Sequence, residues 1–475
     1  MFKFILTFLL ITYLFLPENG CNMKPAPQSY SLIQDSYEEE RVKFGTLAVP
    51  EDHENPGGKT IEIAWAVISA KDASVQKHPL IFLTGGPGGE TLPIVPFFMD
   101  LPLAEDRDLI LFDQRGIGRS SALPDFGEGL LEILAADLTP EQEKEEFNRL
   151  LQLYREKARE QGVDLHHYNT FQNAQDVGML MEHLGYGRYN IMGGSYGSRL
   201  ARVIMDKFPE FIETAVLDSP NPFENDFITS RIKSYAQSLQ LIFNQCKVDI
   251  SCNSEYPNLE KEYFEGIETL HDDPLKIDLE DFNFYVNPQD AIYILRYQLY
   301  RGDALSGAPA LIRALYSRNK DHVRQNIETA LPMIADGNYS MFLSAERFEH
   351  YDSSIDKEML DQLYRELDLF PAPIALFTSL YLAAGSWHHH SVDPSKKIFN
   401  QSGIPTLIFV NKYDPVTPPE NGRIMMEHLN RGYLFILDEG GHGEGNLECK
   451  IEVIRNFFDY PNSPPDPGCL NIADR

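Results

Sequence analysis

One eight-residue stretch combines the end of a strand, a sharp turn and the start of a helix. Residues 190–197 read Asn-Ile-Met-Gly-Gly-Ser-Tyr-Gly, so the pattern Gly-x-Ser-x-Gly follows a short apolar run and precedes a helical pattern. Gly193 and Gly197 have no Cβ atom, which allows strand and helix to approach closely and leaves the Ser195 hydroxyl exposed on strained backbone. The amide of Tyr196 then lies at a helix N-terminus, where it can face an oxyanion. The stretch therefore predicts a nucleophile elbow with Ser195 as the nucleophile.

An acid and a base follow the serine along the chain, each at the end of a predicted buried strand. Residues 406–410, Thr-Leu-Ile-Phe-Val, lead into a polar turn that contains Asp414. Residues 433–437, Tyr-Leu-Phe-Ile-Leu, lead into a glycine-rich turn that contains His442. The carboxyl ends of parallel strands meet at one edge of a sheet, so we expect the three side chains to converge there. His442 would take the proton of Ser195, and Asp414 would fix the imidazole tautomer and stabilise the imidazolium.

A glycine-rich loop provides the second half of a predicted oxyanion hole. The strand predicted at residues 79–83 is followed by Thr84 and then by Gly-Gly-Pro-Gly-Gly. Without side chains, Gly85 or Gly86 can point an amide at the substrate oxygen, opposite the amide of Tyr196. A phosphate-binding loop is the competing interpretation, but no Gly-Lys-Ser/Thr sequence follows the glycines.

Three motifs together resemble those of the prolyl aminopeptidase family of α/β-hydrolases. They are Gly-Gly-Pro-Gly-Gly at residues 85–89, Asp-Gln-Arg-Gly-Ile-Gly-Arg-Ser at residues 113–120, and Gly-Gly-Ser-Tyr-Gly-Ser-Arg-Leu at residues 193–200. The last of these is similar to the exported branch of the family, the secreted tripeptidyl and proline iminopeptidase-like enzymes. The resemblance extends from about Phe44 onward. Thr84 is a departure, because many relatives carry His before the glycines, and it leaves the details of the oxyanion loop open.

The resemblance and the alternation of strands with helices imply an α/β-hydrolase fold. We expect a mostly parallel sheet flanked by helices, with a large, mainly helical cap inserted before the strand that carries the acid. The predicted segments are a signal peptide at residues 1–21, an N-terminal linker at 22–43, the first part of the core at 44–220, the cap at 221–400 and the second part of the core at 401–475.

The composition indicates a large globular protein with an acidic surface. The chain has 475 residues, of which 43% are hydrophobic, so it can bury a large core and an additional domain. Its formal net charge of −30 argues against nucleic acid or an anionic membrane surface as a partner, because phosphates would be repelled. A solvated acidic surface explains most of this charge, although acidity also suits substrates with a free amino terminus.

The N-terminus has the features of an export signal. Lys3 precedes an apolar run at residues 4–16, which is too short for a comfortable membrane span. Export would place the protein in the periplasm, at the cell surface or outside the cell. Cys21 lies where a bacterial lipoprotein would be cleaved and acylated, but Glu18 replaces the usual aliphatic residue of a lipobox. Acylation of Cys21, with attachment to a membrane, and cleavage beyond Cys21 both stay open.

Four further cysteines form two local groups. Cys246 and Cys252 lie close together, and Cys449 and Cys469 lie within one C-terminal segment. In an oxidising compartment these spacings predict two disulfides. Cys21 is left over, and this odd parity slightly favours its acylation.

The motifs predict an exported serine aminopeptidase that releases proline or a short N-terminal peptide through an acyl-enzyme on Ser195. A carboxylesterase of the same fold is the alternative, and a non-catalytic, lipid-anchored binding protein is a third hypothesis. Peptides with a free N-terminus are the expected partners, and the sequence leaves the oligomeric state open. A serine site requires no cofactor. We expect no metal at His388, His389 and His390, because adjacent side chains rarely converge on one ion.

An aminopeptidase must also recognise a free α-amine. This group is cationic near neutral pH, and a pocket that binds it needs a carboxylate. Glu346 resembles a position where relatives carry Cys-x-Asp/Glu, although the cysteine is missing here. Glu224, shortly after the strand that ends at Asp218, is the second candidate. For either residue a solvated carboxylate on a helix face is the competing interpretation, because the chain has 71 acidic residues.

Overall fold

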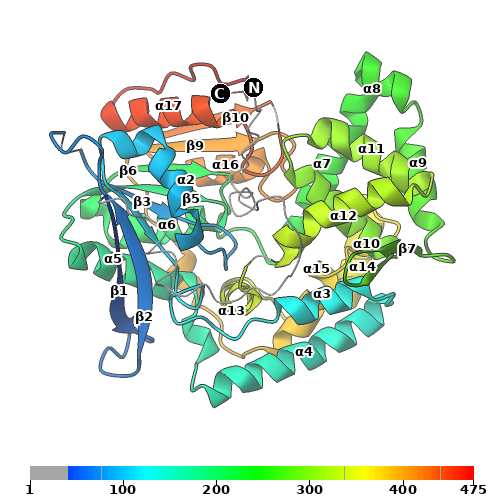
Figure 1. The fold of residues 1–475 in the computed structure, drawn as a ribbon, viewed down its shortest axis with the longest axis horizontal. Helices are drawn as coiled ribbons and strands as arrows, with labels where there is room; N and C mark the ends of the chain where they lie inside the picture. Colours follow the sequence, from blue (N-terminus) through cyan, green and yellow to red (C-terminus); the bar gives the residue numbers. More distant parts are fainter. Residues whose placement is uncertain (1–40, 76, 336, 439, 475) are drawn as a thin grey trace.

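A nine-stranded sheet forms the framework of the left-hand part of the molecule in Figure 1. The structure is a computed structural model that describes residues 41–474 except 76, 336 and 439, so the predicted signal peptide and Cys21 lie outside the described residues. The strands in spatial order are β1 (Val42–Pro50), β2 (Thr60–Ile68), β4 (Leu109–Phe112), β3 (Leu80–Leu83), β5 (Tyr189–Gly194), β6 (Ile212–Asp218), β9 (Thr406–Asn411), β10 (Gly432–Leu437) and β11 (Ile472–Asp474).

The central six strands, from β4 to β10, run parallel to one another. At one edge β1 pairs antiparallel with β2 and β2 antiparallel with β4, while at the other edge β11 pairs antiparallel with β10. The register sets Gly193 beside Leu83 and Gly194 beside Asp218. The carboxyl ends of β3, β5 and β6 therefore lie together, which confirms the predicted mostly parallel fold.

Helices cover both faces of the sheet because alternate strand residues point to opposite sides. Ile408 and Val410 belong to the larger apolar core, and Leu407 and Phe409 belong to a second core on the other face. The helices that pack on the larger core are α5 (Thr170–His183), α6 (Tyr196–Lys207) and α16 (Pro419–Met426). The helices that pack on the second core are α2 (Val95–Asp100) and α17 (Leu447–Asp459).

A mainly helical insertion separates β6 from β9 and forms the right-hand part of the molecule in Figure 1. Its helices are α7 (Thr229–Val248), α8 (Ile250–Glu255), α9 (Leu259–Glu268), α10 (Pro288–Tyr300), α11 (Ala304–Tyr316), α12 (Lys320–Ala335), α13 (Tyr339–Glu349), α14 (Lys357–Leu367) and α15 (Phe377–Ala383). It also contains an antiparallel hairpin of β7 (Leu275–Asp278) and β8 (Asn283–Val286), two strands within a cap that was predicted to be mainly helical.

Two helices from the predicted core segment 44–220 pack with this insertion. They are α3 (Gly127–Ala135), which contacts α12 and β8, and α4 (Pro140–Glu160), which contacts α15 (Figure 1). The side chains of Thr139 and Gln142 cap the N-terminus of α4 reciprocally. The apolar stripe of α4 packs against α15, which comes more than 200 residues later in the chain. The cap is therefore assembled from two parts of the chain.

Both predicted cysteine pairs are disulfide-bonded in the structure. Cys246 at the end of α7 joins Cys252 in α8, and Cys449 in α17 joins Cys469 in the C-terminal segment. The second disulfide lies just before β11, which pairs with β10 at the edge of the sheet. Within the described residues, no helix combines the length and the apolar character needed to cross a membrane.

Candidate active site

The backbone at Ser195 has the strained geometry that a nucleophile elbow requires. Ser195 adopts φ 51° and ψ −121° at the junction of β5 and α6, a region that residues with a side chain rarely occupy. A Cβ atom on Gly197 would lie 1.9 Å from the carbonyl oxygen of Leu83, and one on Gly193 would lie 2.4 Å from that of Gly197. Only glycine fits at these two positions, so the sequence pattern has a steric cause.

His442 and Asp414 form a buried ion pair at the ends of β10 and β9. Nδ1 of His442 lies 2.7 Å from Oδ2 of Asp414. The other oxygen, Oδ1, accepts hydrogen bonds from the amides of Val416 and Thr417. Burial acts to raise the pKa of Asp414, but the charge of His442 and these hydrogen bonds outweigh it and lower the pKa below its ordinary value. Asp414 is therefore ionised where it can orient the imidazole.

Thr417 is a third member of this network that the sequence analysis missed. Its hydroxyl donates to Oδ2 of Asp414 at 2.7 Å and lies 2.9 Å from Nδ1 of His442. The polar turn after β9 contains both residues, but nothing in the local pattern distinguishes this threonine from a solvated one. Its position between acid and base follows from the tertiary arrangement.

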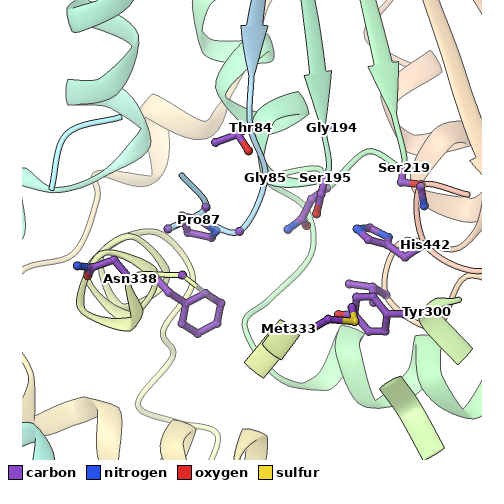
Figure 2. A pocket seen from close by; sticks show the side chains of 18 of the residues that line it. Thr84, Gly85, Pro87, Gly194, Ser195, Ser219, Tyr300, Met333, Asn338 and His442 are labelled. Carbon is purple, nitrogen blue, oxygen red and sulfur yellow. The ribbon is translucent and has the colours of Figure 1, made fainter. Parts of the chain in front are cut away.

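Ser195 and His442 face each other across the pocket. Figure 2 shows the imidazole pointing toward the serine, with Thr84 and Gly85 on the other side of Ser195. Ser195 and His442 both line the same cavity, whereas Asp414 lies behind the histidine. The structure thus brings the predicted nucleophile, base and acid into one arrangement, in the order that proton transfer from serine to histidine needs.

The loop that carries His442 is held by the cap as well as by the sheet. The amide of His442 donates to the carbonyl of Tyr300 at the end of α10, and the two rings meet edge to face at 5.3 Å between centroids. A Cβ atom on Gly441 would lie 2.1 Å from the carbonyl oxygen of Leu299, so this close approach requires glycine. The amide of Gly443 donates to the hydroxyl of Ser219.

A second buried ion pair supports the same loop. Oδ2 of Asp218, the last residue of β6, accepts a hydrogen bond from Nζ of Lys450 at 2.9 Å. Nζ also reaches the carbonyl of Gly443 at 3.4 Å. Both side chains are almost fully buried, so each charge depends on the other.

The predicted oxyanion donors lie around Ser195. Gly85 and Gly86 line the cavity, and a Cβ atom on Gly85 would lie only 3.0 Å from that of Ser195. Gly86 has φ +116°, which favours glycine. Tyr196 is the first residue of α6, so its amide has no acceptor within the helix. The oxyanion role of these three amides stays a prediction.

A buried carboxylate holds the segment that directly follows the glycine-rich loop. Asp113 is buried and accepts hydrogen bonds from the amides of Thr91, Leu92 and Arg119. Burial raises the pKa of Asp113 against the effect of these hydrogen bonds. The side-chain amide of Gln114 donates to the carbonyl of Thr84, which ties the same motif to the loop. The motif at residues 113–120 is therefore structural.

The cavity above Ser195 has a volume of about 230 Å³ and lies between the sheet and the cap. Five aromatic side chains contribute to its cap wall. The cap residues that line it are Asn221, Arg231, Tyr297, Tyr300, Met333, Gly337, Asn338, Tyr339, Phe342, Leu376, Phe377 and Leu380.

Neither predicted amine anchor lines this cavity. Glu346 is buried in α13, where its Oε1 lies 3.1 Å from Nη1 of Arg199 and 3.2 Å from Nη2 of Arg231. Glu224 instead pairs with His428 at 2.8 Å, outside the residues that surround Ser195. Glu346 is thus held by two arginines of this chain, whereas Glu224 keeps 40% of its side chain exposed beside His428. The role of either glutamate as the amine anchor stays a prediction. The acidic side chains that do line the cavity are Glu90 and Asp218.

The three histidines at 388–390 do not converge on one point. His388 is buried with Nε2 at 3.2 Å from the carbonyl oxygen of Ser344, and burial lowers its pKa to about 3. Elsewhere, Asp164, His166 and His167 have ligand atoms within 4.8 Å of one another, a composition that could hold a metal ion. None of these three lines the cavity of Ser195.

Two family descriptions match the parts of the chain that carry this geometry. Residues 78–249 match the alpha/beta hydrolase fold, and residues 378–469 match TAP-like protein. The chain is an α/β-hydrolase by fold. The segment that matches the alpha/beta hydrolase fold includes the elbow and the glycine-rich loop. The segment that matches TAP-like protein includes Asp414 and His442. These matches confirm the resemblance of the motifs to the prolyl and tripeptidyl aminopeptidase-like α/β-hydrolases.

Several relatives of the hydrolase are named as peptidases. The tripeptidyl aminopeptidase of Streptomyces lividans is 30% identical over 188 residues, which is 38% of this chain and 35% of that protein. The serine protease Hip1 of Mycobacterium tuberculosis is 24% identical over 462 residues, which is 89% of this chain and 86% of that protein. The proline iminopeptidase of Arabidopsis thaliana is 27% identical over 176 residues, 37% of this chain and 35% of that protein. The hydrolase thus spans about a third of the length of the tripeptidyl aminopeptidase that it matches.

Proposed function

We propose that this hydrolase is an exported serine aminopeptidase that removes a single residue or a short peptide from the N-terminus of peptide substrates. The single observation that carries the hydrolytic part is the arrangement of Ser195, His442 and Asp414 around one cavity. The names of the relatives support peptides as substrates. The two disulfides support export, because such bonds persist in oxidising compartments.

In the proposed reaction His442 takes the proton of Ser195 as its Oγ attacks the carbonyl carbon of the scissile bond. Amides of Tyr196 and of Gly85 or Gly86 stabilise the oxyanion of the tetrahedral intermediate. The leaving amine then receives the proton from His442, and water, activated by the same imidazole, hydrolyses the acyl-enzyme. Asp414 and Thr417 keep Nε2 of the imidazole directed at the serine.

The cap wall limits what can enter, which supports an exopeptidase. A cavity of about 230 Å³ between sheet and cap suits a short acyl group better than a continuous polypeptide. Glu90 is exposed and lines this cavity, so we add it to Glu346 and Glu224 as a third candidate partner of the substrate amine.

The test compares substrates and the nucleophile in one panel. Aminoacyl and tripeptidyl coumarin amides, their N-acetylated forms and short-chain esters are each assayed with the wild type and with Ser195→Ala. We expect turnover of the free-amine amides, with a loss on the order of 10⁴-fold in Ser195→Ala. Turnover of esters alone, dependent on Ser195, would instead identify a carboxylesterase, and activity that survives in Ser195→Ala would exclude a serine mechanism.

A further inference from the structure

A cation, and not a carboxylate, lines the cap wall of the cavity. Arg231, in the first turn of α7, lines the same cavity as Ser195 and keeps 14% of its side chain exposed. Its guanidinium lies 5.4 Å from the ring centroid of Phe227, 5.2 Å from that of Phe342 and 5.8 Å from that of Phe377. Such rings tolerate a guanidinium but do not neutralise it, and they exclude water from it.

The charges behind Arg231 are unbalanced. We define the arginine cluster as Arg199, Arg231 and Arg296 with the two carboxylates Glu346 and Glu349. Oε1 of Glu346 is shared between Arg199 and Arg231, while Oε2 of Glu349 pairs with Arg199 at 3.2 Å. Three buried or half-buried guanidinium groups therefore meet two carboxylates.

Arg296 is the member of the cluster that creates this imbalance, because Arg199 and Arg231 already pair with the two glutamates. Its side chain is buried between the rings of Tyr300 and Phe377, at 5.1 and 4.4 Å from their centroids, and its Nη1 and Nη2 have no hydrogen-bond partner among the described residues. Arg231 and Arg296 thus share the ring of Phe377. Burial, together with the charge of Arg296, lowers the pKa of Arg231, although Glu346 opposes this shift.

Two further titratable groups packed on the cluster, His350 and Lys397, add no negative charge. Burial and the surrounding cations lower the pKa of His350 well below its ordinary range, so its imidazole is neutral. Lys397 donates to the backbone carbonyl of Glu349 and brings a further cation. An anion that entered the cavity would therefore find uncompensated positive charge at its cap wall.

We propose that Arg231 is the specificity-determining residue of an anion subsite, which binds a carboxylate carried by the substrate. The inference rests on the proposed function, and it deepens that function by naming the substrate class as acidic peptides. A guanidinium offers a planar fork of donors that matches a carboxylate, and Glu346 holds it in place from behind through Nη2. The carboxylate can come from an acidic side chain in the released residues or from the C-terminus of a very short peptide.

The test uses matched pairs that differ only in this carboxylate. Glutamyl and glutaminyl coumarin amides report the side-chain source, and dipeptides with a free or amidated C-terminus report the C-terminal source. The mono-p-nitrophenyl ester of glutarate against p-nitrophenyl valerate extends the comparison to esters. The variants are Arg231→Gln, Arg231→Lys and the control Arg313→Gln, which removes a cap arginine that pairs with Glu262 away from the cavity.

With the wild type we expect kcat/KM to favour the carboxylate in at least one pair by about tenfold or more, the scale of a charged hydrogen-bonded pair. Arg231→Gln should abolish this preference, so that the ratio of kcat/KM within each pair falls to about one. Arg231→Lys should restore part of it, and Arg313→Gln should keep it. A preference for the glutamyl over the glutaminyl amide would assign the carboxylate to a side chain. A preference for the free over the amidated dipeptide would assign it to the C-terminus.

Equal kcat/KM within every pair would overturn the anion subsite and leave the hydrolase assignment intact. Hydrolysis of esters alone, with an Arg231-dependent preference for the glutarate ester, would instead refute the peptidase while keeping the subsite. If nothing is turned over, melting of the full chain in glutarate or glutaramide decides: stabilisation by glutarate alone, absent in Arg231→Gln, supports the subsite, and no difference overturns it.

Discussion

Ser195, His442 and Asp414 depend on neighbouring side chains that carry none of the proposed chemistry themselves. Thr417 contacts both His442 and Asp414, and Lys450 neutralises Asp218 beneath the histidine loop. These groups fix the imidazole to within hydrogen-bonding distance of one carboxylate oxygen. Preorganisation of this kind is what makes a serine site efficient, because nothing must rearrange during proton transfer.

Thr417→Val tests this dependence. The substitution keeps the shape of the side chain but removes the hydroxyl between acid and base. We expect kcat to fall about tenfold with little change in KM, since ground-state binding is not affected. Thr417→Ser serves as the control and should restore most of the activity. A valine variant with wild-type kcat would show that the hydroxyl does not position His442.

Glu346 is the residue whose role changed most between sequence and structure. It holds Arg199 and Arg231 and has no direct access to the cavity. We expect Glu346→Gln to lower the free energy of unfolding by about 3 kcal/mol, because two buried guanidinium groups lose a shared partner. Urea unfolding measures this loss, with Glu262→Gln as a second ion-paired glutamate of the cap for comparison.

The kinetics of Glu346→Gln separate the two roles of this residue. A structural partner of Arg231 should affect amides with a free amine and short-chain esters alike. A selective rise in KM for free-amine substrates would restore Glu346 as the amine anchor.

Helix α4 supports the part of the cap wall that Leu376 and α15 form over the cavity. Glu143 in α4 is buried and accepts hydrogen bonds from the amide of Leu376 at 2.7 Å and from the hydroxyl of Ser379 at 2.8 Å. Leu376 has φ 63° and lines the cavity, so the carboxylate supports a strained backbone segment just before α15. The position of the roof therefore depends on one buried acid from a different part of the chain.

The protonation of Glu143 makes stability depend on pH. Burial raises the pKa of Glu143 to about 7 from the ordinary 4.5, although the two hydrogen bonds oppose this shift. The folded state then binds the proton more tightly than the unfolded chain. This proton therefore adds to the free energy of unfolding. Its contribution is fully present below pH 4.5, the ordinary pKa, and is lost as the pH rises through about 7. The free energy of unfolding changes by about 3 kcal/mol over this range.

Glu143→Gln should therefore flatten the fall in the free energy of unfolding between pH 5 and 8, because the amide does not ionise. Urea unfolding at several pH values measures the slope. Glu145→Gln, at an exposed position of the same helix, should leave the slope of the wild type unchanged. Identical slopes for the wild type and Glu143→Gln would show that another group causes the pH dependence.

For the whole molecule, two disulfides fasten peripheral segments. The cysteines of the Cys449–Cys469 disulfide are 20 positions apart in the sequence, and this bond joins the segment before β11 to α17. The cysteines of the Cys246–Cys252 disulfide are only six positions apart. In the chain-entropy account, the longer loop removes more freedom from the unfolded chain. We expect the double substitution Cys449→Ser and Cys469→Ser to lower the free energy of unfolding by about 3 kcal/mol. The double substitution Cys246→Ser and Cys252→Ser should lower it by less.

Peptide mass mapping without reductant checks the pairing, and urea unfolding checks the energies. Free thiols at all four positions in protein recovered from the cell exterior would contradict both the pairing and the proposed export. A larger loss from the shorter loop would contradict the entropic explanation.

Local patterns in the sequence determined the strands, the elbow and the order of serine, acid and base. Steric rules act over a few residues: only glycine fits at 193 and 197, and apolar runs of five residues suit buried parallel strands. The expected sheet and the meeting of Ser195, Asp414 and His442 follow from these rules once parallel strands are assumed.

Only the tertiary structure decided what surrounds the serine. Arg231 and Glu346 are 115 positions apart in the chain, and whether either faces the cavity depends on how α7 and α13 pack. Thr417 and Glu143 likewise gain their roles from partners that no local pattern identifies. A carboxylate in the sequence has the same appearance whether it meets solvent, a substrate or an arginine. Its function is set by the charges that folding brings next to it.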